Sequence, residues 1–236
     1  MDERTPLVTV AVPNYRHARY LPERLESISN QTFTDVEVLL LDDASPDDSL
    51  AILTAFAEGR PNWSVHPNAV NSGSPFAQWN KAAQLARGRY LWIAESDDVA
   101  EPGLLEALVA ELEADPTCVL ASGQSMLIDE ASRELHSFDV HYRYIFGAEA
   151  ERWITGYRND GVDEIRNYML LHNVVPSASG ALIRLDAFRA VGGADPQWKL
   201  NGDWMAYLKL LERGGISFVP QVLNRFRVHE QTARQK

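Results

Sequence analysis

The stretch from Tyr90 to Asp98 constrains the fold of this chain more than any other. It reads Tyr-Leu-Trp-Ile-Ala-Glu-Ser-Asp-Asp, so mostly apolar residues run directly into a cluster of carboxylates. A short apolar run of this kind predicts a buried strand. Clustered carboxylates repel one another and raise each other's pKa. The cluster must therefore lie in water at the open end of a sheet or hold a cation, and hard oxygen ligands suit Mg²⁺ or Mn²⁺.

The residues before and after this stretch alternate between apolar strand patterns and amphipathic helix patterns. Strands are expected over 7–12, 36–41 and 63–66, and helices over 20–30, 45–58, 76–87 and 101–115. Residues 7–114 thus read β-α-β-α-β-α-β-α, which predicts an α/β fold with a doubly wound, mostly parallel sheet.

The second half of the chain shows a weaker pattern. We expect strands over 119–122, 125–128, 179–184, 216–219 and 222–228, and helices over 162–171, over 186–191 and from Asp203 onward. Residues 129–161 show no periodicity, which is typical of a functional or mobile segment. A single domain over 1–236 accommodates both halves.

Composition excludes several classes of partner. The chain has 22 basic and 33 acidic residues, a net charge of −11, which argues against nucleic acid or anionic lipid as the main partner. The single cysteine, Cys118, rules out an internal disulfide framework and fits a reducing compartment. With no signal peptide and no apolar run of about 18 residues, we expect a cytoplasmic protein without a transmembrane segment.

Polar groups gather where the predicted strands end. In an open α/β sheet, ligands bind beyond the carboxyl ends of the strands. Three such ends carry Pro13-Asn14-Tyr15, Asp42-Asp43 and the acidic cluster 95–98. Tyr15 could stack on a nucleobase and Asp43 could accept a hydrogen bond from a base or a ribose, although Asp42-Asp43 is also typical of a solvated turn. Neither a dinucleotide-binding G-x-G-x-x-G nor a P-loop sequence occurs.

A series of short motifs, found in a fixed order, points to a known family. They are Val12-Pro13-Asn14-Tyr15, Gln31-Thr32-Phe33, Leu41-Asp42-Asp43-Ala44-Ser45, Asn71-x-Gly73, Ala86-Arg87-Gly88-x-Tyr90, Glu95-Ser96-Asp97-Asp98, Val191-Gly192-Gly193, Asn201-Gly202-Asp203-Trp204 and Arg225-Phe226-Arg227-Val228-His229. Together they resemble the family 2 glycosyltransferases, which have the GT-A fold. The resemblance covers roughly residues 7–232 and implies a nucleotide-sugar-binding half over 7–114 and an acceptor-binding half over 115–236.

The resemblance implies a role for each matched residue. Pro13, Asn14 and Tyr15 would bind the nucleoside, Asp43 the base, and Asp97 the ribose or sugar. Independently of the resemblance, Asn71 and Gly73 precede a capped helix, so their loop could present backbone N–H groups to the diphosphate. Asp98 would coordinate Mg²⁺ or Mn²⁺, with His229 completing the metal or diphosphate site. Asp203 would be the general base, and Trp204 would contact a sugar.

The expected reaction is an inverting transfer of one sugar from a nucleoside diphosphate to a hydroxyl group, in polysaccharide or glycoconjugate synthesis. UDP is the first choice of nucleotide, with dTDP or GDP as alternatives, and the acceptor would be a glycan or a lipid-linked glycan. The sequence is also compatible with a homodimer and with a peripheral location at the inner face of a membrane.

Alternative readings remain at several of these positions. Asp203 could be only a helix N-cap, His229 an ordinary strand-end histidine, and Trp204 a core residue. Gly202 stands where the family motif has Glu, which leaves a non-catalytic binding domain of the same fold as an alternative. A nucleotidyltransferase is less favoured, because the loop after the first strand lacks glycines.

Overall fold

The computed structural model describes residues 5–198 and 200–229, and its central element is one mixed β-sheet. The first half contributes β1 (Val8–Asn14), β2 (Val36–Asp42), β3 (Trp63–Val65) and β4 (Tyr90–Ile93). These strands pair in parallel in the order β3-β2-β1-β4. Every residue of β1 and β4 is buried, as expected for strands covered by helices on both faces.

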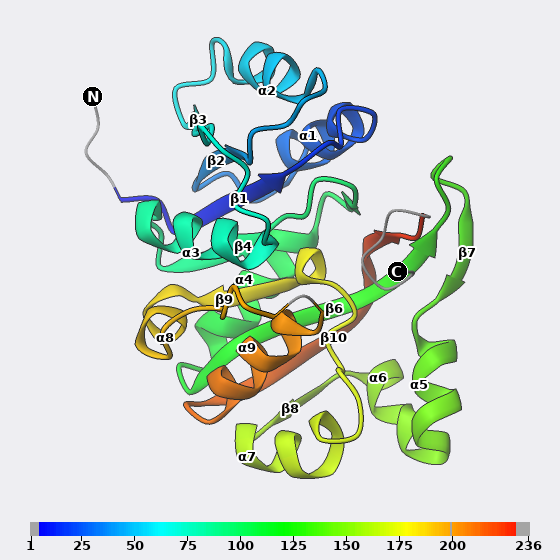
Figure 1. The fold of residues 1–236 in the computed structure, drawn as a ribbon. Helices are drawn as coiled ribbons and strands as arrows, with labels where there is room; N and C mark the ends of the chain where they lie inside the picture. Colours follow the sequence, from blue (N-terminus) through cyan, green and yellow to red (C-terminus); the bar gives the residue numbers. More distant parts are fainter. Residues whose placement is uncertain (1–4, 199, 230–236) are drawn as a thin grey trace.

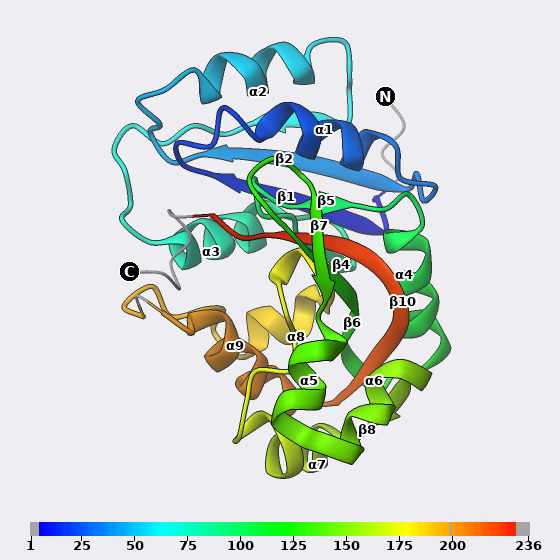
Figure 2. The same cartoon turned by 90° about the vertical axis from the view of Figure 1, so that its right-hand side faces the viewer.

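Helices cover both faces of this sheet (Figures 1 and 2). The four predicted in the first half form as α1 (Leu21–Ser29), α2 (Ser49–Ala57), α3 (Pro75–Leu85) and α4 (Leu104–Ala114). Leucines of α1, α2 and α4 pack against the valines of β1 in one core. Aromatic residues of α3 share a second core, on the opposite face, with α8 (Leu185–Ala190) and α9 (Gly202–Leu211).

The second half of the chain extends the same sheet. It contributes β5 (Val99–Ala100), β6 (Cys118–Ile128), β9 (Ala181–Arg184) and β10 (Gly215–Arg227), so the order continues β4-β9-β6-β10-β5. Because β9 is antiparallel to both β4 and β6, it joins the two parallel regions of the sheet. The two pairs of strands expected over 119–128 and 216–228 are each one long strand, and β10 carries an irregularity between Val219 and Val222, where Pro220 has no N–H to donate.

Residues 129–161 contain more regular structure than their sequence indicates. They form β7 (Glu134–Ser137), α5 (Asp139–Phe146), a 3₁₀ turn (Gly147–Glu151), α6 (Arg152–Thr155) and β8 (Tyr157–Asn159). The scattered aromatic residues meet in a small core, in which Trp153 stacks on Tyr142 and Phe146 at centroid distances of 4.4 and 4.8 Å. These elements are too short for a periodic pattern to reveal them.

Two short elements follow that core. The helix expected over 162–171 is α7 (Gly161–Glu164) followed by a π-helical turn (Ile165–Met169). Residues 172–177 then lead to a 3₁₀ turn (Ala178–Gly180) before β9. Among residues 5–198 and 200–229, no helix combines the length and apolar character needed to span a bilayer.

Candidate active site

The ends of β1 and β2 are fastened to each other by a buried amide. Asn14, the last residue of β1, donates from Nδ2 to Asp42 Oδ1 at 2.9 Å and to Ser45 Oγ at 3.1 Å. Asp43 N donates to the Asn14 carbonyl at 2.9 Å. The predicted strand-end residues of the first half are therefore held in one rigid corner of the sheet.

Asp43 is the centre of a dense hydrogen-bond network. Its carboxylate accepts from Asn68 Nδ2 at 2.6 Å and from Gln78 Nε2 at 2.8 Å. It also accepts from Asn71 Nδ2 at 3.1 Å and from Ser72 Oγ at 2.7 Å. Both carboxylate oxygens thus hold the loop that follows β3. The alternative interpretation of Asp42-Asp43 as a solvated turn therefore does not describe Asp43.

A cavity of about 750 Å³ opens beside this corner. Six of the residues predicted to bind the nucleotide sugar line it together: Pro13, Asn14, Tyr15, Asp43, Asn71 and Gly73. Gly73 has a φ of +71°, a conformation that glycine adopts without strain, and its N–H donates to Asn71 Oδ1 at 2.8 Å. Glu95, Ser96 and Leu200 complete the far side, so the cavity extends from the corner at Asn14 and Asp43 to the acidic cluster and toward the start of α9.

At the acidic end of this cavity, Asp97 lies between two histidines. His17, Asp97 and His229 offer one ligand atom each, all within 4.8 Å of one another. Asp97 Oδ2 is 2.9 Å from His229 Nε2, and His17 Nδ1 is 2.8 Å from Ser96 Oγ. Burial by itself would raise the pKa of Asp97, but the hydrogen bond to His229 and the nearby His17 lower it overall.

His17 was not among the residues that the sequence singled out. Its only signal is its place just after Pro13-Asn14-Tyr15-Arg16, in a loop at a strand end. Burial lowers its pKa, which favours the neutral imidazole that can ligate a metal. Two imidazole nitrogens and a carboxylate form a donor set that suits Mn²⁺ better than Mg²⁺, which prefers oxygen ligands.

Asp98 lies on the other side of the strand end and is bonded inside the protein. Its Oδ2 accepts from Ser177 Oγ at 2.7 Å, and its Oδ1 accepts from Arg227 N at 2.8 Å. Burial, followed by the charge of Asp97, raises its pKa to about 6. The geometry groups Asp97, rather than Asp98, with the two histidines.

A buried arginine lies beneath the acidic cluster. The Arg24 guanidinium packs over the Trp92 ring at 4.9 Å, and its charge acts on Asp98, Asp97 and Glu95. Burial lowers its pKa to about 10, so it stays charged at neutral pH and offsets part of the negative charge of the cluster.

Glu95, the first carboxylate of the cluster, gives a testable pH effect. It accepts from Trp79 Nε1 at 2.9 Å, and burial, together with the charge of Asp97, raises its pKa from 4.5 to about 8. Since the folded protein binds this proton more tightly than the unfolded chain, the stabilisation is complete below the unfolded pKa of about 4.5 and is lost as pH rises through about 8.

We expect the melting temperature of the metal-free protein to fall between about pH 5 and pH 8, and Glu95→Gln to shrink that fall by about 2–4 °C. Glutamine keeps an acceptor for Trp79 but does not ionise. Calorimetry across this pH range measures the difference, and an equal fall in both proteins would contradict the assignment.

The predicted base, Asp203, is at the second position of α9. The N-cap of this helix is Asn201, with a φ of +59°, so the alternative reading of Asp203 as the N-cap is wrong. Asp203 is partly exposed, and its Oδ2 accepts from Asn173 Nδ2 at 3.3 Å. The neighbouring Trp204 donates from Nε1 to the Met169 carbonyl at 2.9 Å, and its ring centroid is 6.2 Å from that of His172.

Gly202 has a packing reason to be glycine. A Cβ atom at this position would lie 2.3 Å from Cε2 of the Phe76 ring, so the ring fills the space that a side chain would need. A glutamate at this position would therefore overlap the Phe76 ring of α3.

We expect Gly202→Ala to destabilise the protein by about 1–3 kcal/mol through this overlap. The companion change Phe76→Leu should restore part of the loss, and urea unfolding of the single and double variants measures both. Strictly additive effects of the two changes would show that the overlap is not the cause.

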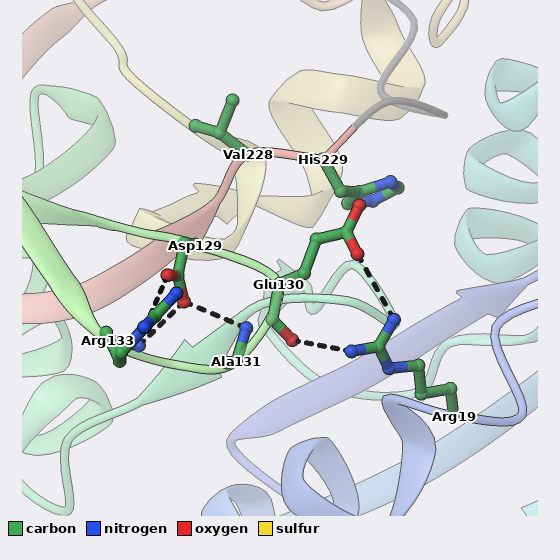
Figure 3. A pocket seen from close by; sticks show the side chains of 7 residues that line it. All are labelled: Arg19, Asp129, Glu130, Ala131, Arg133, Val228 and His229. Atoms are coloured by element: carbon green, nitrogen blue, oxygen red, sulfur yellow. Dashed lines mark hydrogen bonds and ion pairs between the residues drawn. The ribbon is translucent and has the colours of Figure 1, made fainter.

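A second cavity, of about 480 Å³, lies on the outer side of His229 (Figure 3). Its charged side chains pair with each other: Arg19 Nη1 is 3.2 Å from Glu130 Oε2, and Arg133 Nε is 2.7 Å from Asp129 Oδ2. His229 thus lines a cavity whose charges are paired, whereas Glu95 and Ser96 of the acidic cluster line the larger cavity.

This fold is that of a GT-A glycosyltransferase domain. The model of the Glycosyl transferase family 2 matches residues 9–192, and the chain belongs to this family. The predicted family and fold are therefore confirmed.

Three individual proteins illustrate the similarity. A chondroitin synthase from Escherichia coli is 34% identical over 131 residues, which are 52% of this chain and 18% of the synthase. The structure of S. aureus TarS (residues 1–349) in complex with UDP-GlcNAc aligns with a TM-score of 0.71 at 18% identity, over 96% of this chain and 60% of that one. The mannosyltransferase PcManGT from Pyrobaculum calidifontis, in complex with GDP-Man and Mn²⁺, aligns with a TM-score of 0.72 at 21% identity, over 98% of this chain and 59% of that one. The chain thus spans less than two thirds of each of these proteins.

Proposed function

We propose that this protein transfers one sugar, with inversion, from a nucleoside diphosphate sugar to a hydroxyl group of a glycan or lipid-linked glycan. The observation that carries the proposal is the continuity of one cavity from the nucleoside corner at Asn14 and Asp43 to the acidic cluster beside His17. A nucleotide needs the first part of this cavity and its diphosphate needs the second. Bacterial relatives that are named as polysaccharide synthases support the same activity.

In the nucleoside part, the exposed ring of Tyr15 is available to stack on a base, with Pro13 beside it. Asp43 orders the loop that carries Asn71 and Gly73 through hydrogen bonds. In the proposed complex, Asp43 acts on the edge of the nucleobase indirectly, by positioning this loop. The titles of the TarS and PcManGT structures name UDP-GlcNAc and GDP-Man, so uridine and guanosine diphosphates are the first candidates and dTDP the next.

The metal site of the proposed enzyme consists of His17, Asp97 and His229. This changes two roles suggested by the sequence: Asp97 is the carboxylate ligand instead of a sugar contact, and Asp98 positions the strand ends around it. A bound Mn²⁺ would offset the negative charge that develops on the leaving diphosphate. The proposal is supported by the ligand atoms of His17, Asp97 and His229, which lie within 4.8 Å of one another.

Asp203 acts as the general base of the proposed reaction. A carboxylate that is partly exposed can accept a proton from a hydroxyl group brought within hydrogen-bond distance. Trp204, next in sequence, offers a ring beside which an acceptor sugar can lie. The acceptor would then approach from the side of α9, opposite the nucleoside corner.

Thermal stability in the presence of UDP, GDP and dTDP, each with and without Mn²⁺, tests this proposal. A nucleotide at about 100 times its Kd stabilises a protein by about 2.7 kcal/mol, which corresponds to about 5–10 °C for a chain of this size. We expect at least one nucleotide to produce this shift only with Mn²⁺. Stabilisation by none of them would contradict the nucleotide site, and release of pyrophosphate instead of a nucleoside diphosphate would indicate a nucleotidyltransferase.

A further inference from the structure

Residues 172–179, which we call the 172–179 strap, connect the predicted base to the acidic cluster. Near one end, Asn173 Nδ2 donates to Asp203 Oδ2 at 3.3 Å. Toward the other end, Ser177 Oγ donates to Asp98 Oδ2 at 2.7 Å, and Ser179 Oγ accepts from Glu95 N at 3.0 Å. One short segment therefore contacts both groups that the proposed reaction must hold at a fixed separation.

The strap is fastened to the protein between these contacts. Val174 and Val175 are completely buried. The Val174 carbonyl accepts from Tyr142 Oη at 2.8 Å, and the Ser179 carbonyl accepts from Trp92 Nε1 at 2.7 Å. Buried bonds of this kind are costly to break, so the strap can transmit position from one end to the other.

The amide of Asn173 is held in one orientation. Its Oδ1 accepts from Val175 N at 3.1 Å, so turning the amide over would leave that N–H without its acceptor. Nδ2 consequently faces Asp203, and the bond uses one of the two carboxylate oxygens. The other oxygen can then be directed at an acceptor hydroxyl.

We propose that Asn173 is the positioning residue of Asp203 and that the 172–179 strap sets the separation between this base and the acidic cluster. The inference rests on the proposed function, because Asp203 has a proton to accept only in a transfer reaction. It assigns a part in that function to Asn173, which is far from Asp203 in sequence and lies in a segment with no sequence motif of its own.

Two substitutions of Asn173 test this role. Asn173→Ala should lower the kcat for release of UDP or GDP from UDP-GlcNAc or GDP-Man with Mn²⁺ by about 10- to 100-fold, as expected when a reacting group is misplaced. The Kd for the nucleotide should change less than twofold. Asn173→Asp keeps an acceptor for Val175 N but places a second carboxylate beside Asp203, so the acidic limb of the pH–rate profile should move upward by about one unit.

Asn159→Ala is the matched control. Asn159 Nδ2 donates to the carboxylate of Glu164 at 2.8 Å, in the same half of the protein and away from the cavity. This variant should lower the urea midpoint and leave kcat unchanged. If Asn173→Ala behaves like the control, or if Asn173→Asp leaves the pH–rate profile in place, the proposal is overturned.

A double-mutant cycle separates this proposal from the proposed function. If the wild-type protein uses neither sugar nucleotide, the transfer function fails for those donors, and the strap is judged from urea midpoints alone. Asn173→Ala, Asp203→Ala and the double variant should then shift the midpoint non-additively, because the two residues share one bond. Additive shifts would show that Asn173 does not hold Asp203.

Discussion

Asp203→Asn is expected to lower the rate of sugar transfer by about 10²–10⁴-fold, the range typical for loss of a general base. The asparagine side chain has nearly the same shape and can still accept the hydrogen bond from Asn173. It cannot take a proton from a hydroxyl group. Nucleotide binding should stay within about twofold of the wild type, because Asp203 is not among the residues that line the nucleoside corner.

The measurement is release of UDP or GDP from UDP-GlcNAc or GDP-Man, with Mn²⁺, in water and with a panel of simple glycosides as acceptors. Asp163→Asn is the control, because Asp163 also lies in the first turn of a short helix, α7, where only its charge matters. An equal loss in both variants would mean that Asp203 acts through its helix. An unchanged rate in Asp203→Asn would place the base elsewhere.

Much of the first half could be predicted from the sequence because its signals are local. Each strand is an apolar run that ends in polar residues, and each helix shows its apolar positions within one or two turns. The convergence of Asn14, Asp43 and the acidic cluster also followed from one rule, that parallel strands present their carboxyl ends at the same edge of a sheet. The structure places these residues around one cavity.

The proposed metal site was harder to predict because its members are far apart in sequence. Asp97 and His229 are 132 residues apart, and His17 and Ser96 are 79 residues apart. Asp97 and Asp98 are adjacent acids with the same motif signal, and only their partners in space distinguish them: Ser177 and the Arg227 N–H bond Asp98, whereas His229 bonds Asp97. The sequence thus showed which residues carry suitable chemistry, but it did not show which of them lie next to one another in the fold.

The second half of the chain was predicted less well wherever tertiary contacts stabilise short elements. Tyr142, Phe146 and Trp153 lie in the stretch 129–161, which shows no periodicity, yet they stack together and hold α5 and α6 in place. Gly202 appeared as a departure from a motif until the Phe76 ring was found where its side chain would be. Both features depend on residues that no local pattern brings together.

Asp97→Asn should abolish the Mn²⁺-dependent part of nucleotide binding and weaken the Kd for UDP or GDP by about 100-fold or more. The substitution removes the negative charge of the only carboxylate in the group of His17, Asp97 and His229. Loss of a residue that only supports a metal ligand lowers metal affinity by about 10–100-fold, and loss of a ligand itself should cost at least as much. His17→Ala and His229→Ala should each weaken binding in the same direction.

Asp98→Asn is the informative comparison, because the two acids are neighbours with opposite assigned roles. It keeps an oxygen to accept from Arg227 N, and its amide can donate to Ser177 Oγ, so we expect Mn²⁺ affinity to change less than tenfold. Asp129→Asn, at the second cavity, controls for general loss of negative charge. Isothermal titration with Mn²⁺ and UDP measures all of these variants. If Asp98→Asn loses the metal and Asp97→Asn keeps it, the ligand is Asp98 as the sequence suggested, and the two histidines hold Asp97 for a different purpose.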